Sequence, residues 1–191
     1  MSTSTEVVTL LPDTPLVREA RGILERAAPS TLVAHSIRSF LYGRAYGRSH
    51  AMGCDDEEGL LLAALFHDLG FCPEHQDRRL PFQVVGSRAL REFLSEQGTE
   101  PERISALVDA IDFHMQLLPR WSKGNTAGLL QVGAWMDITG LRRWGISSDA
   151  RTIEGAYPRD GIRLRFYGFL FGSFGGVGSC VGTLFPGRYR E

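Results

Sequence analysis

Cysteine is scarce in this chain, and the residues present do not suit a disulfide framework. The three thiols are Cys54, Cys72 and Cys180, an odd number without Cys-x-x-Cys spacing. This usage excludes a disulfide-stapled secreted domain and favours reduced thiols in the cytoplasm. The first residues also lack the basic stretch and apolar run of a secretion signal. We therefore expect a cytoplasmic location.

The chain also has almost no surplus of charge of either sign. It contains 21 Lys and Arg residues against 22 Asp and Glu residues, which gives a formal net charge of −1. Such a balance provides no global attraction to nucleic acid or to acidic membranes. We expect a small-molecule substrate and no nucleic-acid partner.

Long apolar runs are nearly absent as well. One uncharged stretch, residues 166–185, has the length needed to cross a bilayer. Glycines interrupt it repeatedly, which dilutes its hydrophobicity and weakens a continuous helix. The sequence therefore predicts no membrane insertion and assigns residues 173–191 to a glycine-rich C-terminal segment.

Most of the chain carries apolar residues at helical spacing. A helix is predicted to start after Asp13-Thr14-Pro15, and a second helix covers residues 32–40. Four acidic residues at 55–58 precede the apolar run 59–66, as is favourable at a helix N-terminus. Further helices are predicted at 83–97, 101–115, 126–139 and 159–171. The fold class is therefore all-α, with one domain over residues 13–172 after an N-terminal extension of residues 1–12.

Histidine and aspartate interrupt three of these apolar segments. His35, the pair His67-Asp68, and Asp137 lie on separate predicted helices. Imidazole nitrogens and carboxylate oxygens together suit divalent ions such as zinc, iron, manganese or cobalt. Gly70 offers a helix end at which both members of the adjacent pair can turn towards one ion. The ordered set His, His-Asp, Asp predicts a metal site.

These residues carry a family resemblance. The segments involved are His35–Gly43, Phe66–Gly70, Arg79–Ser87, Asp109–His114 and Asp137–Gly140. On them the chain resembles HD-domain metal-dependent enzymes and, among these, the cyanamide hydratase-like branch. The resemblance implies a single-domain HD-type helical bundle in which His35, His67, Asp68 and Asp137 hold the metal.

Two positions depart from the pattern of that branch. The branch commonly has a Phe-Glu pair followed by Gly-Ala, where this chain has Phe82-Gln83 and Gly86-Ser87. No role of the missing carboxylate can therefore be transferred to Gln83.

The resemblance also implies a reaction and a cofactor. The expected enzyme is a hydro-lyase that adds water to cyanamide, giving urea, or to a similar small nitrile. The expected cofactor is one divalent ion, with Zn²⁺ preferred over Fe²⁺, Mn²⁺ and Co²⁺. Its role would be to lower the pKa of a bound water, which then supplies hydroxide as the nucleophile. Asp68 serves as ligand and catalytic carboxylate, and His114 transfers protons or contacts the substrate.

Four further side chains are predicted to bind the substrate. They are His75, Arg38, Phe82 and Trp135. His75 lies in a loop, residues 71–81, that is expected to form the rim of the site. Arg38 follows His35 by one helical turn and so faces the same side, although a salt bridge to a core-facing acid is an equally good interpretation.

Other functions stay open at this point. An HD-domain phosphohydrolase acting on a nucleotide or another phosphate ester is the first alternative, and it would need converging Arg and Lys side chains. A di-iron oxygenase would need further histidine ligands, for which only His75 and His114 are available between the His-Asp pair and Asp137. A metal-binding module without turnover and a homo-oligomer are also compatible with the sequence.

Overall fold

The fold is helical throughout the part of the chain that the structure describes. The structure is a computed structural model that describes residues 10–77, 79–159 and 161. Its α-helices are α2 (Pro15–Ala27), α3 (Ser30–Ser49), α4 (Glu57–Phe66), α5 (Phe82–Glu96), α6 (Pro101–Phe113), α7 (Asn125–Thr139) and α8 (Ser147–Ala156). Short 3-10 turns lie at Leu69–Phe71, Trp121–Lys123 and Arg143–Ile146. The prediction of an all-α fold is confirmed.

Local signals explain where the helices begin. The Thr14 hydroxyl accepts a hydrogen bond from the Val17 backbone N–H at 3.1 Å, and Pro15 occupies the first turn of α2. The Asp56 carboxylate accepts from the Gly59 N–H at 2.7 Å and caps α4. Both starts agree with the sequence.

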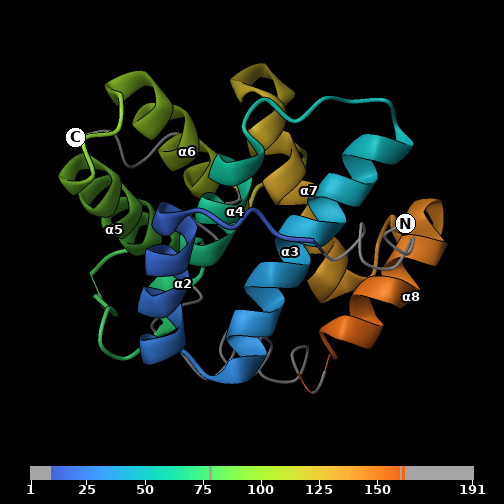
Figure 1. Cartoon of the computed structure of the whole chain (residues 1–191), viewed down its shortest axis with the longest axis horizontal. Helices are drawn as coiled ribbons and strands as arrows, with labels where there is room; N and C mark the ends of the chain where they lie inside the picture. Colours follow the sequence, from blue (N-terminus) through green and yellow to red (C-terminus); the bar gives the residue numbers. More distant parts are fainter. Residues whose placement is uncertain (1–9, 78, 160, 162–191) are drawn as a thin grey trace.

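Helices α3 and α7 pack together through the middle of the molecule, with α8 on one side and α5 and α6 on the other (Figure 1). Glycine permits this close approach. A Cβ at Gly133 of α7 would lie 1.9 Å from the Ser39 carbonyl oxygen, and a Cβ at Gly43 of α3 would lie 2.4 Å from the Leu129 carbonyl oxygen. Helix α4 is buried along its apolar run, and it contacts α2, α3, α5, α6 and α7.

The C-terminal helix differs from the prediction. The structure forms α8 at Ser147–Ala156, which the sequence analysis did not predict. Neither Arg159 nor Gly161 is helical, so the expected helix over 159–171 does not begin where predicted, and its other residues lie outside the described part. Residues 166–185 and the glycine-rich segment 173–191 also lie outside it. None of the described helices is both long and apolar enough to cross a membrane.

Candidate metal centre

The end of α4 presents two potential ligands to one point. Regular α-helix stops at Phe66, and His67 and Asp68 lead into the 3-10 turn Leu69–Phe71. This turn lies directly against α5, where a Cβ at Gly70 would lie 2.2 Å from the Phe82 carbonyl oxygen. Beside it, His67 Nε2 lies 3.4 Å from Asp68 Oδ2. Gly70 is thus required for close packing at the predicted helix end.

Helix α3 adds His35 to this pair. His35 Nε2 lies 3.2 Å from His67 Nε2 and 3.3 Å from Asp68 Oδ2. Ligand atoms placed tetrahedrally around a single zinc ion are about 3.4 Å apart, given metal–ligand distances of about 2.1 Å. The three side chains form a buried group that could hold a metal ion.

The hydrogen bonding of Asp68 fits a metal. Its Oδ2 atom is buried and has no hydrogen-bond partner, although buried polar atoms normally have one. A metal ion between this oxygen and the two Nε2 atoms would supply the missing partner. The donor set therefore fits a divalent cation.

His114, at the end of α6, faces the other carboxylate oxygen of Asp68. Its Nε2 is 3.8 Å from Asp68 Oδ1, and its ring meets the His67 ring edge-on with centroids 4.9 Å apart. The Trp135 indole N–H donates to the His114 carbonyl oxygen at 3.1 Å and anchors this turn to α7. His114 is therefore beside the group of three, with a different carboxylate oxygen as its neighbour.

All three histidines are held in one tautomer. The Nδ1 atoms of His67 and His114 lie 2.7 Å from the Ala64 carbonyl oxygen and 2.6 Å from the Ile111 carbonyl oxygen. His35 Nδ1 lies 2.7 Å from Asp137 Oδ2. Carbonyl and carboxylate oxygens only accept, so each Nδ1 must carry the proton. Each Nε2 is therefore the ring nitrogen that faces Asp68, and it could bind a metal ion once it carries no proton.

Burial and neighbouring charge separate the pKa values of these groups. Burial would lower the pKa of His35, but the carboxylates of Asp137 and Asp68 beside the ring raise it to about 9. Burial lowers the pKa of His67 to about 3. Burial would raise the pKa of Asp68, but the neighbouring imidazoles of His67 and His35 hold it at about 2. A protonated His35 places a positive charge among the donor atoms, as a metal ion would.

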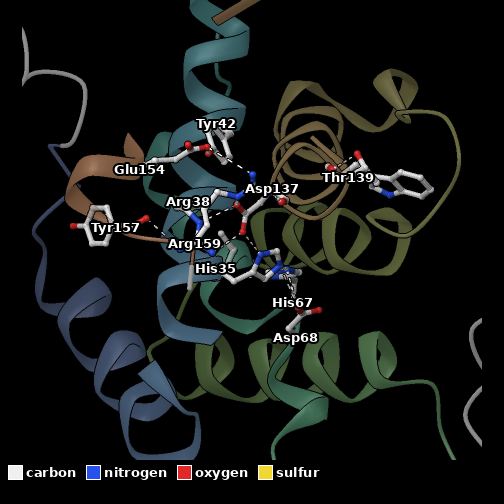
Figure 2. Close-up of polar contacts among 12 residues, drawn as sticks. His35, Arg38, Tyr42, His67, Asp68, Asp137, Thr139, Glu154, Tyr157 and Arg159 are labelled. Atoms are coloured by element: carbon white, nitrogen blue, oxygen red, sulfur yellow. Dashed lines mark hydrogen bonds and ion pairs between the residues drawn. The ribbon is translucent and has the colours of Figure 1, made fainter. Parts of the chain in front are cut away.

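Asp137, the fourth predicted ligand, does not join this group. Its carboxylate lies on the Nδ1 side of His35, away from the Nε2 atoms, and it pairs with Arg38 and Arg159 (Figure 2). The structure therefore brings together three of the four predicted ligands. The His35 ring lies between Asp137 and the atoms of the other two ligands.

The predicted substrate-binding residues lie in different places. Arg38 donates to both oxygens of Asp137, from Nε to Oδ1 and from Nη2 to Oδ2, each at 2.8 Å. The structure thus shows the salt bridge to a core-facing acid, which was the other interpretation of Arg38. The Phe82 ring meets the His114 ring at 5.8 Å, at the edge of the group. Trp135 reaches the backbone of His114, as given above. The His75 backbone N–H donates to the Cys72 carbonyl oxygen at 2.9 Å, within the turn of the predicted rim loop.

Sequence reasoning missed Arg159. This side chain follows α8 and donates from Nε to Asp137 Oδ1 at 3.1 Å and from Nη2 to the Asp137 carbonyl oxygen. Glu154 of α8 extends the network, because its carboxylate accepts from the Tyr42 hydroxyl at 2.6 Å. No periodicity or motif in the sequence marks Arg159, so nothing there predicted its place.

Comparison with known families agrees with this geometry. Residues 32–132 match the HD domain. The chain belongs to the HD-domain family. The matched range contains His35, His67, Asp68 and His114, and it ends before Asp137. A search of curated proteins finds no match to the chain. HD domains bind divalent metals, and together with the assembled His35, His67 and Asp68 this indicates a metal-dependent enzyme of hydrolase type.

Proposed function

We propose that this HD-domain protein hydrates cyanamide, giving urea, or a similarly small nitrile. The observation that carries the proposal is the combination of a buried donor group with arginines that are already paired. His35, His67 and His114 are each 1% exposed and Asp68 is 2% exposed, which favours a very small substrate over a nucleotide. Arg38 and Arg159 are both bonded to Asp137, the carboxylate behind His35, so a neutral substrate suits the site better than a phosphate.

The chain's own residues have separate tasks in this proposal. His35 Nε2, His67 Nε2 and Asp68 would hold one divalent ion, with zinc as the first choice. When bound, such an ion supplies an acidified water near neutral pH. Phe82 closes the site beside His114 and keeps bulk water from it.

Proton transfer is assigned to His114. Burial lowers the pKa of His114 and outweighs the opposing charge of Asp68, so the ring is neutral at pH 7. Its Nδ1–H is engaged by Ile111, which leaves Nε2 to accept a proton from water and return it. Hydration of cyanamide adds the water oxygen to the nitrile carbon and both water protons to the nitrile nitrogen. A single base that first accepts and then donates satisfies this balance.

Phosphohydrolase activity is the second candidate, because it is frequent among HD-domain enzymes. A phosphate substrate would require Arg or Lys side chains that are free to contact it. The pairing of Arg38 and Arg159 with Asp137 argues against this. A di-iron oxygenase would need additional histidine ligands, and of the two available histidines His75 lies in the turn after Cys72, to whose carbonyl oxygen its backbone N–H donates at 2.9 Å.

The test is a urea assay with zinc-loaded protein and cyanamide, beside a panel of nucleotides. We expect urea formation that disappears in the metal-depleted protein. His114→Ala should lower kcat about 100-fold or more while zinc content stays unchanged, because loss of a general acid–base group has an effect of this size. His50→Ala is the matched control, since the exposed His50 ring stacks on Tyr46 and should leave kcat unaltered.

Two outcomes would contradict the proposal. Nucleotide hydrolysis without urea formation would favour the phosphohydrolase. No turnover of either class by zinc-loaded protein would favour an oxygenase or a metal-binding module.

A further inference from the structure

Asp137 is a buried carboxylate whose two oxygens both accept hydrogen bonds. Oδ1 accepts from Arg38 Nε at 2.8 Å and from Arg159 Nε at 3.1 Å. Oδ2 accepts from Arg38 Nη2 at 2.8 Å and from His35 Nδ1 at 2.7 Å. Each oxygen therefore already receives two N–H donors, which uses its in-plane lone pairs.

Asp68 has the opposite environment. It is also buried, but its Oδ2 has no hydrogen-bond donor and lies between two imidazole Nε2 atoms. The two carboxylates thus approach His35 from opposite ends of its ring, one at Nε2 and the other at Nδ1. Only the carboxylate at the Nε2 end has an oxygen left for a cation.

We propose that Asp137 is a positioning residue and not a metal ligand. It holds the proton on His35 Nδ1 and fixes the ring so that Nε2 points at the ion, which His35, His67 and Asp68 bind. A carboxylate behind a ligating histidine also increases the basicity of that ligand. The inference rests on the proposed metal site and is independent of the nitrile chemistry.

The segment after α8 takes part in this positioning. Arg38 donates from Nη1 to the Pro158 carbonyl oxygen at 2.7 Å and to the Tyr157 carbonyl oxygen at 3.3 Å. Arg159 binds both the carboxylate and the carbonyl oxygen of Asp137. The orientation of Asp137 therefore depends on residues 157–159, more than 120 positions after His35 in the chain.

The experiment measures zinc affinity by competition with a chromophoric chelator. For Asp68→Asn we expect loss of the zinc ion. For Asp137→Asn we expect one bound zinc with affinity weakened about 10- to 100-fold, as is usual when a partner of a ligating histidine is removed. The visible spectrum of the cobalt-substituted Asp137→Asn protein should keep the wild-type intensity, because the ligand set is unchanged.

A milder pair of variants tests the positioning itself. Arg159→Gln removes one donor to Asp137 and should weaken zinc binding by about 10-fold or less, below the full loss of the partner. Arg21→Gln, at an exposed arginine that pairs with Glu25, is the matched control and should leave the affinity unchanged. Equal affinities for Arg159→Gln and Arg21→Gln would contradict the role of residues 157–159.

Asp137→Asn removes the charged partner of the buried Arg38, so its folding must be checked by circular dichroism. If it does not fold, nitrogen-15 NMR of the wild-type histidines decides. The His35 Nδ1–H signal should persist when zinc is added. Its disappearance would overturn the proposal, as would complete loss of zinc from folded Asp137→Asn protein. Zinc binding with this pattern but without nitrile turnover would uphold the role of Asp137 and refute the substrate.

Discussion

At the scale of single residues, hydrogen-bond partners decide which atoms are left for chemistry. The Nδ1 atom of each histidine at the site is hydrogen-bonded to an oxygen of Ala64, Ile111 or Asp137. The Nε2 atoms of these histidines are therefore the ring nitrogens that remain for a metal. The same rule distinguishes the two aspartates at the site. One carboxylate is saturated with donors and the other retains a buried oxygen without a partner.

Asp56 allows a prediction at this scale, because it has two separable roles. It caps α4 through the Gly59 N–H and pairs with Arg103, whose Nε lies 2.6 Å from Oδ2. Asp56→Asn keeps a capping oxygen and loses the charge, whereas Asp56→Ala loses both. Urea denaturation at pH 7 should show Asp56→Ala to be less stable than Asp56→Asn by about 1 kcal/mol.

The ion pair also predicts a pH dependence. Burial would raise the pKa of Asp56, but hydrogen bonds from Arg103 and Gly59 lower it. A lowered folded-state pKa gives stability that is present above the unfolded value, about 3.9, and is lost as pH falls through the folded value. The difference in unfolding free energy between wild type and Asp56→Asn should therefore be full at pH 7 and shrink below about pH 4. A difference that stays constant to pH 3 would contradict this.

Residue types and order were enough to predict which elements carry the site. His35, His67 and Asp68 come together as the sequence suggested, and His114 lies beside them. The position of Asp137 relative to His35 could not be predicted. It depends on Arg159, whose contact is set by the path of the chain after α8 and leaves no trace in local spacing.

At the scale of elements, the close packing of α3 on α7 places Asp137 next to His35. Gly133 lies one helical turn before Asp137, and Ser39 lies one turn after His35. A methyl group at Gly133 would collide with the Ser39 carbonyl oxygen, which is part of a helix backbone and cannot turn aside.

We therefore predict that Gly133→Ala destabilises the protein by about 1–3 kcal/mol, the usual effect of overpacking a core. Gly155→Ala in α8 is the control, because a Cβ there meets no atom within 4 Å. It should stabilise the protein by about 0.4–1 kcal/mol. Denaturant titrations of both variants measure this, and equal stabilities would show that the helix contact is looser than described.

Apolar spacing and capping residues were sufficient to predict that α2 to α7 exist, because these helices are long or begin with a marked start, although α3 (Ser30–Ser49) extends well beyond the predicted residues 32–40. Helix α8 was missed since it has only ten residues and buries only Ala150 and Ile153. Its one start signal is the polar run Ser147-Ser148-Asp149, which also reads as a loop.

At the scale of the whole molecule, the metal site and the residues beside it come from five helices or their ends. His35 comes from α3, His67 and Asp68 from the end of α4, His114 from the end of α6, Asp137 from α7, and Arg159 follows α8. A cation bound at their meeting point must stabilise the folded chain, because the unfolded chain has no such site.

Thermal unfolding should show this coupling. Zinc at 100 times its Kd stabilises a folded protein by about 2.7 kcal/mol, which in a chain of this size raises Tm by about 5–11 °C. His67→Ala should abolish the shift. An equal shift in wild type and His67→Ala would mean that zinc binds elsewhere.

The central claim is that one ion binds between His35, His67 and Asp68. Anomalous diffraction from crystals of the zinc-loaded protein tests it most directly. We expect one peak about 2.0–2.2 Å from His35 Nε2, His67 Nε2 and a carboxylate oxygen of Asp68, with Asp137 still bonded to His35 Nδ1. A peak bonded to Asp137, or no peak among these residues, would contradict the account.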